Sequence, residues 1–141
     1  MKVADAMART ITAASPEDRI KDAALAMREE DAGFLPVVAD GQLVGVLTDR
    51  DIVLRCIAEG TTDPVEGTVG EVMSTEVKAV SPGLDLEDAA QLMANAQIRR
   101  LPVVDDSGAL VGVLSHGNLV QATKGQGPGP RVATEGVTRG A

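Results

Sequence analysis

The 141-residue sequence has one cysteine, one aromatic residue and one histidine, and each scarcity excludes a class of protein. A single cysteine, Cys56, forms neither an internal disulfide nor a cysteine-based zinc site, and its apolar neighbours predict a buried, inert thiol. His116 has neither a second ligand nor a carboxylate partner in its motif, so it predicts neither a metal site nor a catalytic base.

Basic residues and long apolar runs are also few. Thirteen basic residues stand against 21 acidic ones, a formal charge of −8, and Phe34 is the only aromatic ring. Nucleic-acid surfaces usually combine basic patches with stacking rings, so no nucleic-acid partner is expected. No apolar run approaches about 18 residues, and the N-terminus lacks the layout of a signal peptide. We therefore expect a soluble, cytoplasmic protein with no membrane partner.

What the sequence does contain is an internal duplication. Residues 35–38, Leu-Pro-Val-Val, return as residues 101–104 at an offset of 66. Residues 43–47, Leu-Val-Gly-Val-Leu, return as residues 110–114 at an offset of 67, because Ser107 adds one position. Each half has about 60 residues, which is marginal for a domain alone, so we expect the halves to bury apolar faces against each other.

Each half begins with the pattern of an amphipathic helix. Ser15-Pro16 predicts an N-cap followed by proline at the first helical position, and Asp18 completes a weak capping box. The apolar stripe then has helical spacing and occurs in both halves: Ile20, Ala23, Ala24 and Met27, then Leu86, Ala89, Ala90 and Met93.

Two short strands and a closing helix follow in each half. Buried strands are predicted at 35–38 and 101–104, each followed by a glycine-containing turn and a second apolar strand. Closing helices are predicted from Asp49 to about Ala58 and from His116 to about Thr123. The fold class is α/β (α+β) with short sheets. The expected organisation is a first motif over 1–60, a linker over 61–68, a second motif over 69–124 and a disordered tail over 125–141.

One short motif has side chains that are suited to ligand binding. Thr48 ends a strand and Asp51 lies one turn into the next helix, so both side chains face a point beyond the strand end. A carboxylate accepts hydrogen bonds from a vicinal diol and a threonine hydroxyl adds another, which suits a ribose. Thr-x-x-Asp is equally the pattern of a plain helix capping box. Gly45, three residues earlier, permits close approach of backbone or of a flat ring.

The order, spacing and duplication of these segments resemble a tandem pair of CBS domains, named after cystathionine β-synthase, over residues 1 to about 124. The closing Thr-Asp-Arg-Asp-Ile-Val looks most similar to stand-alone pairs of the hypoxic-response type. The resemblance implies two β-α-β-β-α motifs packed sheet to sheet about a pseudo-twofold axis. It also implies two clefts for adenosyl ligands: AMP, ADP, ATP or S-adenosylmethionine.

Carried onto this sequence, the resemblance makes Thr48 and Asp51 the ribose-binding pair of the first cleft. It assigns Arg99 and Arg100 to the phosphate, because guanidinium groups suit phosphate oxygens and supply positive charge in an acidic protein. A solvated strand edge is the other interpretation of these two arginines. The strand over 76–79 contributes to the adenine wall, for which the expected residues are Gly45, Val77 and Ala79.

The second cleft departs from the family pattern. It would use Ser115 and Asn118 with residues 10–13, Gly33 and Phe34. Asn118 replaces the carboxylate, and Gly33-Phe34 offers no charge. This cleft is therefore expected to bind more weakly. Arg50 is the basic residue expected to contact a phosphate there.

The predicted function is a non-enzymatic sensor or regulator with an adenosyl ligand, no required cofactor and an unidentified effector protein. Broad apolar helix faces and the resemblance favour a C2 homodimer. A structural interaction module whose clefts bind nothing physiological is the main alternative. An enzyme is disfavoured, because one histidine and one cysteine form no clustered nucleophile–base pair.

Overall fold

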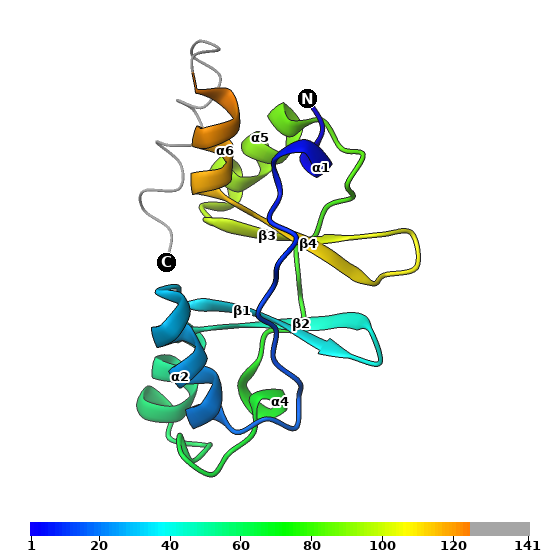
Figure 1. Cartoon of the computed structure of the whole chain (residues 1–141). Helices are drawn as coiled ribbons and strands as arrows, with labels where there is room; N and C mark the ends of the chain where they lie inside the picture. Colours follow the sequence, from blue (N-terminus) through cyan, green and yellow to red (C-terminus); the bar gives the residue numbers. More distant parts are fainter. Residues whose placement is uncertain (125–141) are drawn as a thin grey trace. The chain divides into compact units, whose positions relative to one another are not determined.

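The structure, a computed structural model, describes residues 1–124 (Figure 1). The chain divides into two compact units. Unit 1 contains residues 1–11 and the chain from Lys78 onward, and unit 2 contains Thr12–Val77. The disorder predicted for 125–141 lies outside the described residues.

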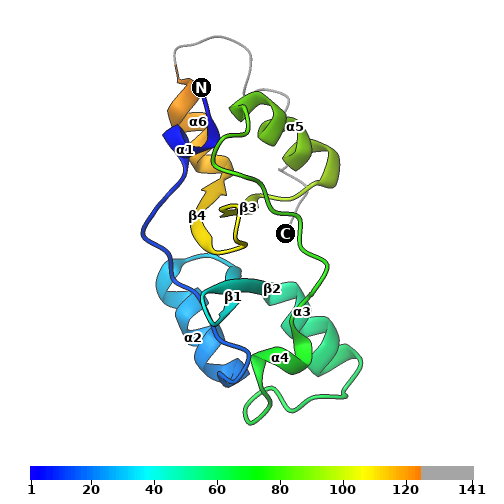
Figure 2. The same ribbon diagram turned by 90° about the vertical axis from the view of Figure 1, so that its right-hand side faces the viewer.

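Both units contain mixed helix and strand, as predicted, and each includes one short helix from the other repeat. Unit 2 contains α2 (Ile20–Glu30), β1 (Phe34–Ala39), β2 (Gln42–Thr48), α3 (Asp49–Ile52), the π-helix η1 (Val53–Ala58) and α4 (Val69–Val72). Unit 1 contains α1 (Val3–Ala6), α5 (Leu86–Ala96), β3 (Arg100–Val104), β4 (Leu110–Ser115) and α6 (His116–Thr123). Figures 1 and 2 show α2 and α4 on one face of the β1–β2 hairpin, and α1, α5 and α6 on one face of the β3–β4 hairpin.

The two hairpins confirm the predicted strands. β1 and β2 pair antiparallel with Leu35 opposite Leu47, and β3 and β4 pair in the same way with Leu101 opposite Leu114. The first turn has positive φ at both Asp40 (52°) and Gly41 (78°). Two successive residues of positive φ match the twist of an antiparallel ribbon, which explains the Asp-Gly pair.

The units do not follow the boundaries of the sequence repeats, because the first helix of each repeat packs in the other repeat's unit. The N–H of Val3 donates to the carbonyl of Leu84 (2.9 Å), and Lys2 Nζ lies 2.6 Å from Asp85 Oδ1. In unit 2, the N–H of Gly70 donates to the carbonyl of Pro16 (2.9 Å). The repeats are therefore joined by an exchange of segments as well as by the linker.

Each unit has its own apolar core, completed by the exchanged segment. In unit 2, Val69 and Val72 are fully buried against Ile20 and other residues of the first repeat. Cys56 also lies in this core, as expected, and burial raises the pKa of its thiol. Three of the four residues predicted for the apolar stripe of α2 are buried. The prediction is wrong for Ala24, which is exposed.

The predicted helix starts are wrong by several residues. α2 begins at Ile20, and Ser15-Pro16 lies in a turn instead of capping the helix. The N–H of Asp18 donates to the Ser15 carbonyl (3.1 Å), while Asp18 Oδ2 accepts the Ser15 N–H (2.9 Å). Of the reciprocal capping box predicted for Ser15 and Asp18, only the bond to the Asp18 carboxylate forms, and it closes a turn that leads from the sheet into the helix.

The first strand of each motif is shorter than expected. Residues 10–13 and 76–79 lie in no strand, and only Ala14 and Val80 pair in parallel, with Val37 and Val103. A proline follows each paired residue after one intervening serine. Because proline has no N–H to donate, it ends the pairing on the C-terminal side of Ala14 and Val80.

Candidate functional site

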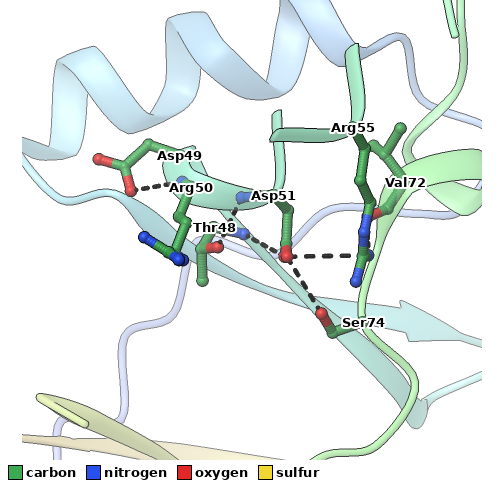
Figure 3. Close-up of polar contacts among 7 residues, drawn as sticks. All are labelled: Thr48, Asp49, Arg50, Asp51, Arg55, Val72 and Ser74. Carbon is green, nitrogen blue, oxygen red and sulfur yellow. Dashed lines mark hydrogen bonds and ion pairs between the residues drawn. The ribbon is translucent and has the colours of Figure 1, made fainter. Parts of the chain in front are cut away.

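Thr48 and Asp51 lie where β2 gives way to α3, and they contact each other reciprocally (Figure 3). The N–H of Asp51 donates to Thr48 Oγ1 (3.1 Å), and the N–H of Thr48 donates to Asp51 Oδ2 (3.0 Å). The capping-box interpretation of Thr-x-x-Asp is therefore confirmed as local structure. It is compatible with ligand binding, because a carboxylate has about four lone-pair positions and this cap uses one.

The other oxygen of the Asp51 carboxylate has two neighbours that the sequence did not predict. Ser74 Oγ donates to Asp51 Oδ1 (3.1 Å), and Arg55 Nη1 lies 3.7 Å from the same oxygen. The Asp51 side chain is only 13% exposed, so these partners hold a largely desolvated charge. Arg55 also donates to the carbonyl of Val72, on the segment that carries Ser74.

Ser74 reaches Asp51 because its backbone is paired with β2. The N–H of Ser74 donates to the Val46 carbonyl (2.8 Å), and the N–H of Val46 donates to the Ser74 carbonyl (2.9 Å). Gly45 permits this approach, since a Cβ there would lie 2.8 Å from the Ser74 carbonyl oxygen. Of the two roles open to Gly45, the structure shows the close approach of backbone.

The equivalent site of the second repeat has the same cap without its charge. The N–H of Ser115 donates to Asn118 Oδ1 (2.9 Å), and the N–H of Asn118 donates to Ser115 Oγ (3.0 Å). Ala8 occupies the position of Ser74 and Ala122 that of Arg55. This difference between the repeats is the sequence signal that could have revealed Ser74 and Arg55.

Arg99 and Arg100 lie at the start of β3, in unit 1, beside the second repeat's cap. Arg100 is paired with Ser115, and the N–H of His116 donates to the Arg99 carbonyl (2.8 Å). Burial and the charge of Arg99 lower the pKa of Arg100. Neither guanidinium has an ion-pair partner among residues 1–124. Thr48 and Asp51 belong to unit 2, so a phosphate contact shared with them stays a prediction.

The remaining predicted residues fall in both units. Val77 is partly buried in unit 2, and Ala79 is partly buried in unit 1. Arg50 is exposed on α3, and its backbone N–H donates to Asp49 Oδ1 (2.8 Å). The Asp49 carboxylate fills the space beside Gly33, where a Cβ would lie 2.2 Å from Oδ2. The predicted phosphate position near Arg50 and Gly33 therefore has a carboxylate next to it.

His116 makes the stability of the second repeat depend on pH. Its Nδ1 is buried without a hydrogen-bond partner among residues 1–124, and burial, followed by the charge of Arg99, lowers the pKa of the imidazole below 6.5. Between the folded and unfolded pKa values the unfolded chain binds more protons, so stability falls as pH drops below about 6.5. His116→Gln should lose less stability than wild type between pH 7.5 and 5.5 in urea unfolding. Equal losses would contradict this role of His116.

The chain belongs to the CBS domain family: the family model of the CBS domain matches residues 3–57 and 69–125. It matches twice, as the duplication predicted.

Similar proteins include stand-alone CBS proteins. The CBS domain-containing protein YhcV of Bacillus subtilis is 47% identical over 117 residues, covering 83% of this chain and 81% of that protein. Hypoxic response protein 1 of Mycobacterium tuberculosis is 33% identical over 118 residues, with 83% and 81% covered. The predicted resemblance to hypoxic-response proteins is therefore confirmed.

Solved structures share the fold. The structure of CBSX2 of Arabidopsis thaliana in complex with AMP has a TM-score of 0.76 and 33% identity, covering 86% of this chain and 95% of that one. Hypoxic Response Protein I with two coordinated zinc ions has a TM-score of 0.76 and 32% identity, with 86% and 98% covered. In residues 1–124 of the present chain, no three His, Cys, Asp or Glu side chains gather as a metal site. No helix in the same range is long and apolar enough to span a bilayer.

Proposed function

We propose that this protein is a non-enzymatic regulatory module that binds an adenosyl ligand and transmits its binding as a change of shape. The observation that carries the proposal is the Asp51 carboxylate, held at the end of β2 with acceptor positions to spare. Membership of the CBS family and the AMP complex of CBSX2, 33% identical, support an adenine nucleotide as the ligand.

The proposed ligand contacts follow the sequence prediction. Thr48 and Asp51 bind the ribose, and Arg99 and Arg100 bind phosphate. The adenine wall is formed by Gly45, Val77 and Ala79. A weaker second site uses Ser115 and Asn118, where an amide replaces the carboxylate, with Arg50 as its basic residue.

An interaction module without a physiological ligand is the alternative, favoured by the uncharged Ser115–Asn118 cap. A thermal-shift panel of AMP, ADP, ATP, adenosine and S-adenosylmethionine separates the two. A ligand that binds only the folded state raises the melting temperature as its concentration exceeds Kd. We expect at least one of these compounds to do so. No shift from any of them at millimolar concentration would favour the interaction module.

We also propose a cytoplasmic C2 homodimer. Large apolar side chains lie exposed on η1 of unit 2, with Val53 51%, Leu54 40% and Ile57 70% exposed. Contiguous exposed apolar side chains are a common feature of interaction surfaces. Light scattering should give twice the 14.5 kDa chain mass. Ile57→Glu should shift the protein toward monomer, and a concentration-independent monomer of the wild type would contradict the dimer.

A further inference from the structure

We propose that Ser74 and Arg55 are positioning residues that hold the Asp51 carboxylate for the two neighbouring hydroxyls of a ribose. They make this half of the protein select ribonucleosides over 2′-deoxyribonucleosides. The inference rests on the proposed function, since it requires an adenosyl ligand at Asp51, and it adds the specificity of that same site.

The hydrogen bonds of Asp51 leave a matched pair of acceptors. Oδ2 accepts one bond, from the Thr48 N–H, and Oδ1 accepts one bond, from Ser74 Oγ (Figure 3). With about two lone-pair positions on each oxygen, one remains free on each. A 2′,3′-diol presents two O–H donors at adjacent carbons. The orientation of the carboxylate therefore suits a bidentate contact that a 2′-deoxyribose makes only in part.

Ser74 can hold this orientation because its own position is rigid. Both its backbone N–H and its carbonyl are bonded to Val46 of β2, at 2.8 and 2.9 Å. Arg55 adds a second restraint, since it donates to the Val72 carbonyl and lies 3.7 Å from Asp51 Oδ1. The Asp51 carboxylate is thus restrained by Ser74, whose backbone is paired with β2, and by Arg55 on η1.

The second repeat serves as an internal comparison. Ala8 forms the same backbone pair with Val113, at 2.9 and 3.0 Å, and has no hydroxyl. The backbone pairing of the fold therefore does not require serine. Where the carboxylate is absent, at Asn118, the serine and the arginine are absent too, replaced by Ala8 and Ala122. The serine and the arginine therefore form a set with the carboxylate.

A purely structural role makes a different prediction. If Ser74 and Arg55 only compensate a buried charge, removing the hydroxyl lowers stability and leaves the ribose preference unchanged. If they orient the carboxylate, removing it lowers the preference itself. The ratio of the adenosine and 2′-deoxyadenosine affinities is therefore the informative quantity, because general damage to the site affects both ligands alike.

The experiment is calorimetric titration of wild type, Ser74→Ala and Ser74→Thr with adenosine and 2′-deoxyadenosine. We expect wild type to prefer adenosine and Ser74→Ala to lose about three- to tenfold of that preference, the range of a single hydrogen bond. Ser74→Thr keeps the hydroxyl and should keep the preference. An unchanged ratio in Ser74→Ala would overturn the positioning role while leaving the proposed function intact. Failure of wild type to bind either nucleoside or any nucleotide would overturn both.

A transplant tests whether the set is sufficient. Ala8→Ser, Asn118→Asp and Ala122→Arg together reproduce the arrangement in the second repeat, and Asn118→Asp alone is the matched control. The triple variant made in an Asp51→Ala background should bind adenosine more tightly than 2′-deoxyadenosine. The control in that background should show less preference. Equal ratios in the two would show that the carboxylate needs no positioning partners and would contradict the inference.

Discussion

Asp51→Ala is expected to weaken binding of the adenosyl ligand by about ten- to a hundredfold. The substitution removes a charged acceptor from the ribose diol, and a hydrogen bond to a charged group contributes roughly 1.5–3 kcal/mol. Asp51→Asn should lose less, since one acceptor oxygen remains. Calorimetric titration with AMP measures the change.

The confirmed cap requires a control, because Asp51→Ala also removes the bond to the Thr48 N–H. Loss of a helix cap lowers stability by about 1 kcal/mol without changing ligand affinity. Asn118→Ala makes the same change at the cap of the second repeat. It should lower stability by about 1 kcal/mol, the contribution of the cap, and leave the tighter AMP site intact. If the Asp51→Ala protein binds AMP as tightly as wild type, Thr48 and Asp51 only cap the helix and do not bind the ligand.

The second large effect is expected at the arginine pair. Arg99→Ala with Arg100→Ala should weaken AMP about ten- to a hundredfold and change adenosine little, because only the phosphorylated ligand uses these charges. Added salt should weaken AMP binding in wild type more than in the double variant. The contrast between AMP and adenosine makes the result independent of general damage to the fold.

Arg28→Ala, an exposed arginine on α2, is the matched control for loss of positive charge. It should leave the affinities of both ligands near their wild-type values. Equal losses for AMP and adenosine in the Arg99 and Arg100 variant would contradict a phosphate role and support a structural one for the strand edge.

The elements best predicted from the sequence are those with local causes. The β1–β2 hairpin follows from two apolar runs joined by Asp40-Gly41, and positive φ at both turn residues explains the pair. The closing helix after Thr48 follows from a cap that spans four residues, Thr48 to Asp51. The internal duplication strengthened each prediction, because the same sequence pattern occurs in both halves.

The starts of α2 and α5 were misplaced because a distant contact competes with a local one. Ser15-Pro16 is a good helix start in isolation, yet Ala14 pairs with Val37 and the Pro16 carbonyl accepts the N–H of Gly70. These partners lie in the hairpin and in the exchanged segment. Spacing along the chain gives no indication of them.

The same limit applies to the candidate site. Thr48 and Asp51 were found because they lie three positions apart, whereas Ser74 lies 23 positions from Asp51. A serine after a methionine has no pattern of its own. Its significance appears only when the segment is placed against β2, with Gly45 allowing the approach.

The most direct test of ligand binding at Thr48 and Asp51 is a two-dimensional amide NMR titration of the 15N-labelled protein with AMP. The amides of Thr48 and Asp51 participate in the cap, and that of Ser74 lies beside it. We predict saturable shifts of these three resonances at wild-type affinity, with the shifts lost in Asp51→Ala. Saturable shifts confined to other residues, or no saturable shift at millimolar AMP, would contradict binding at this site.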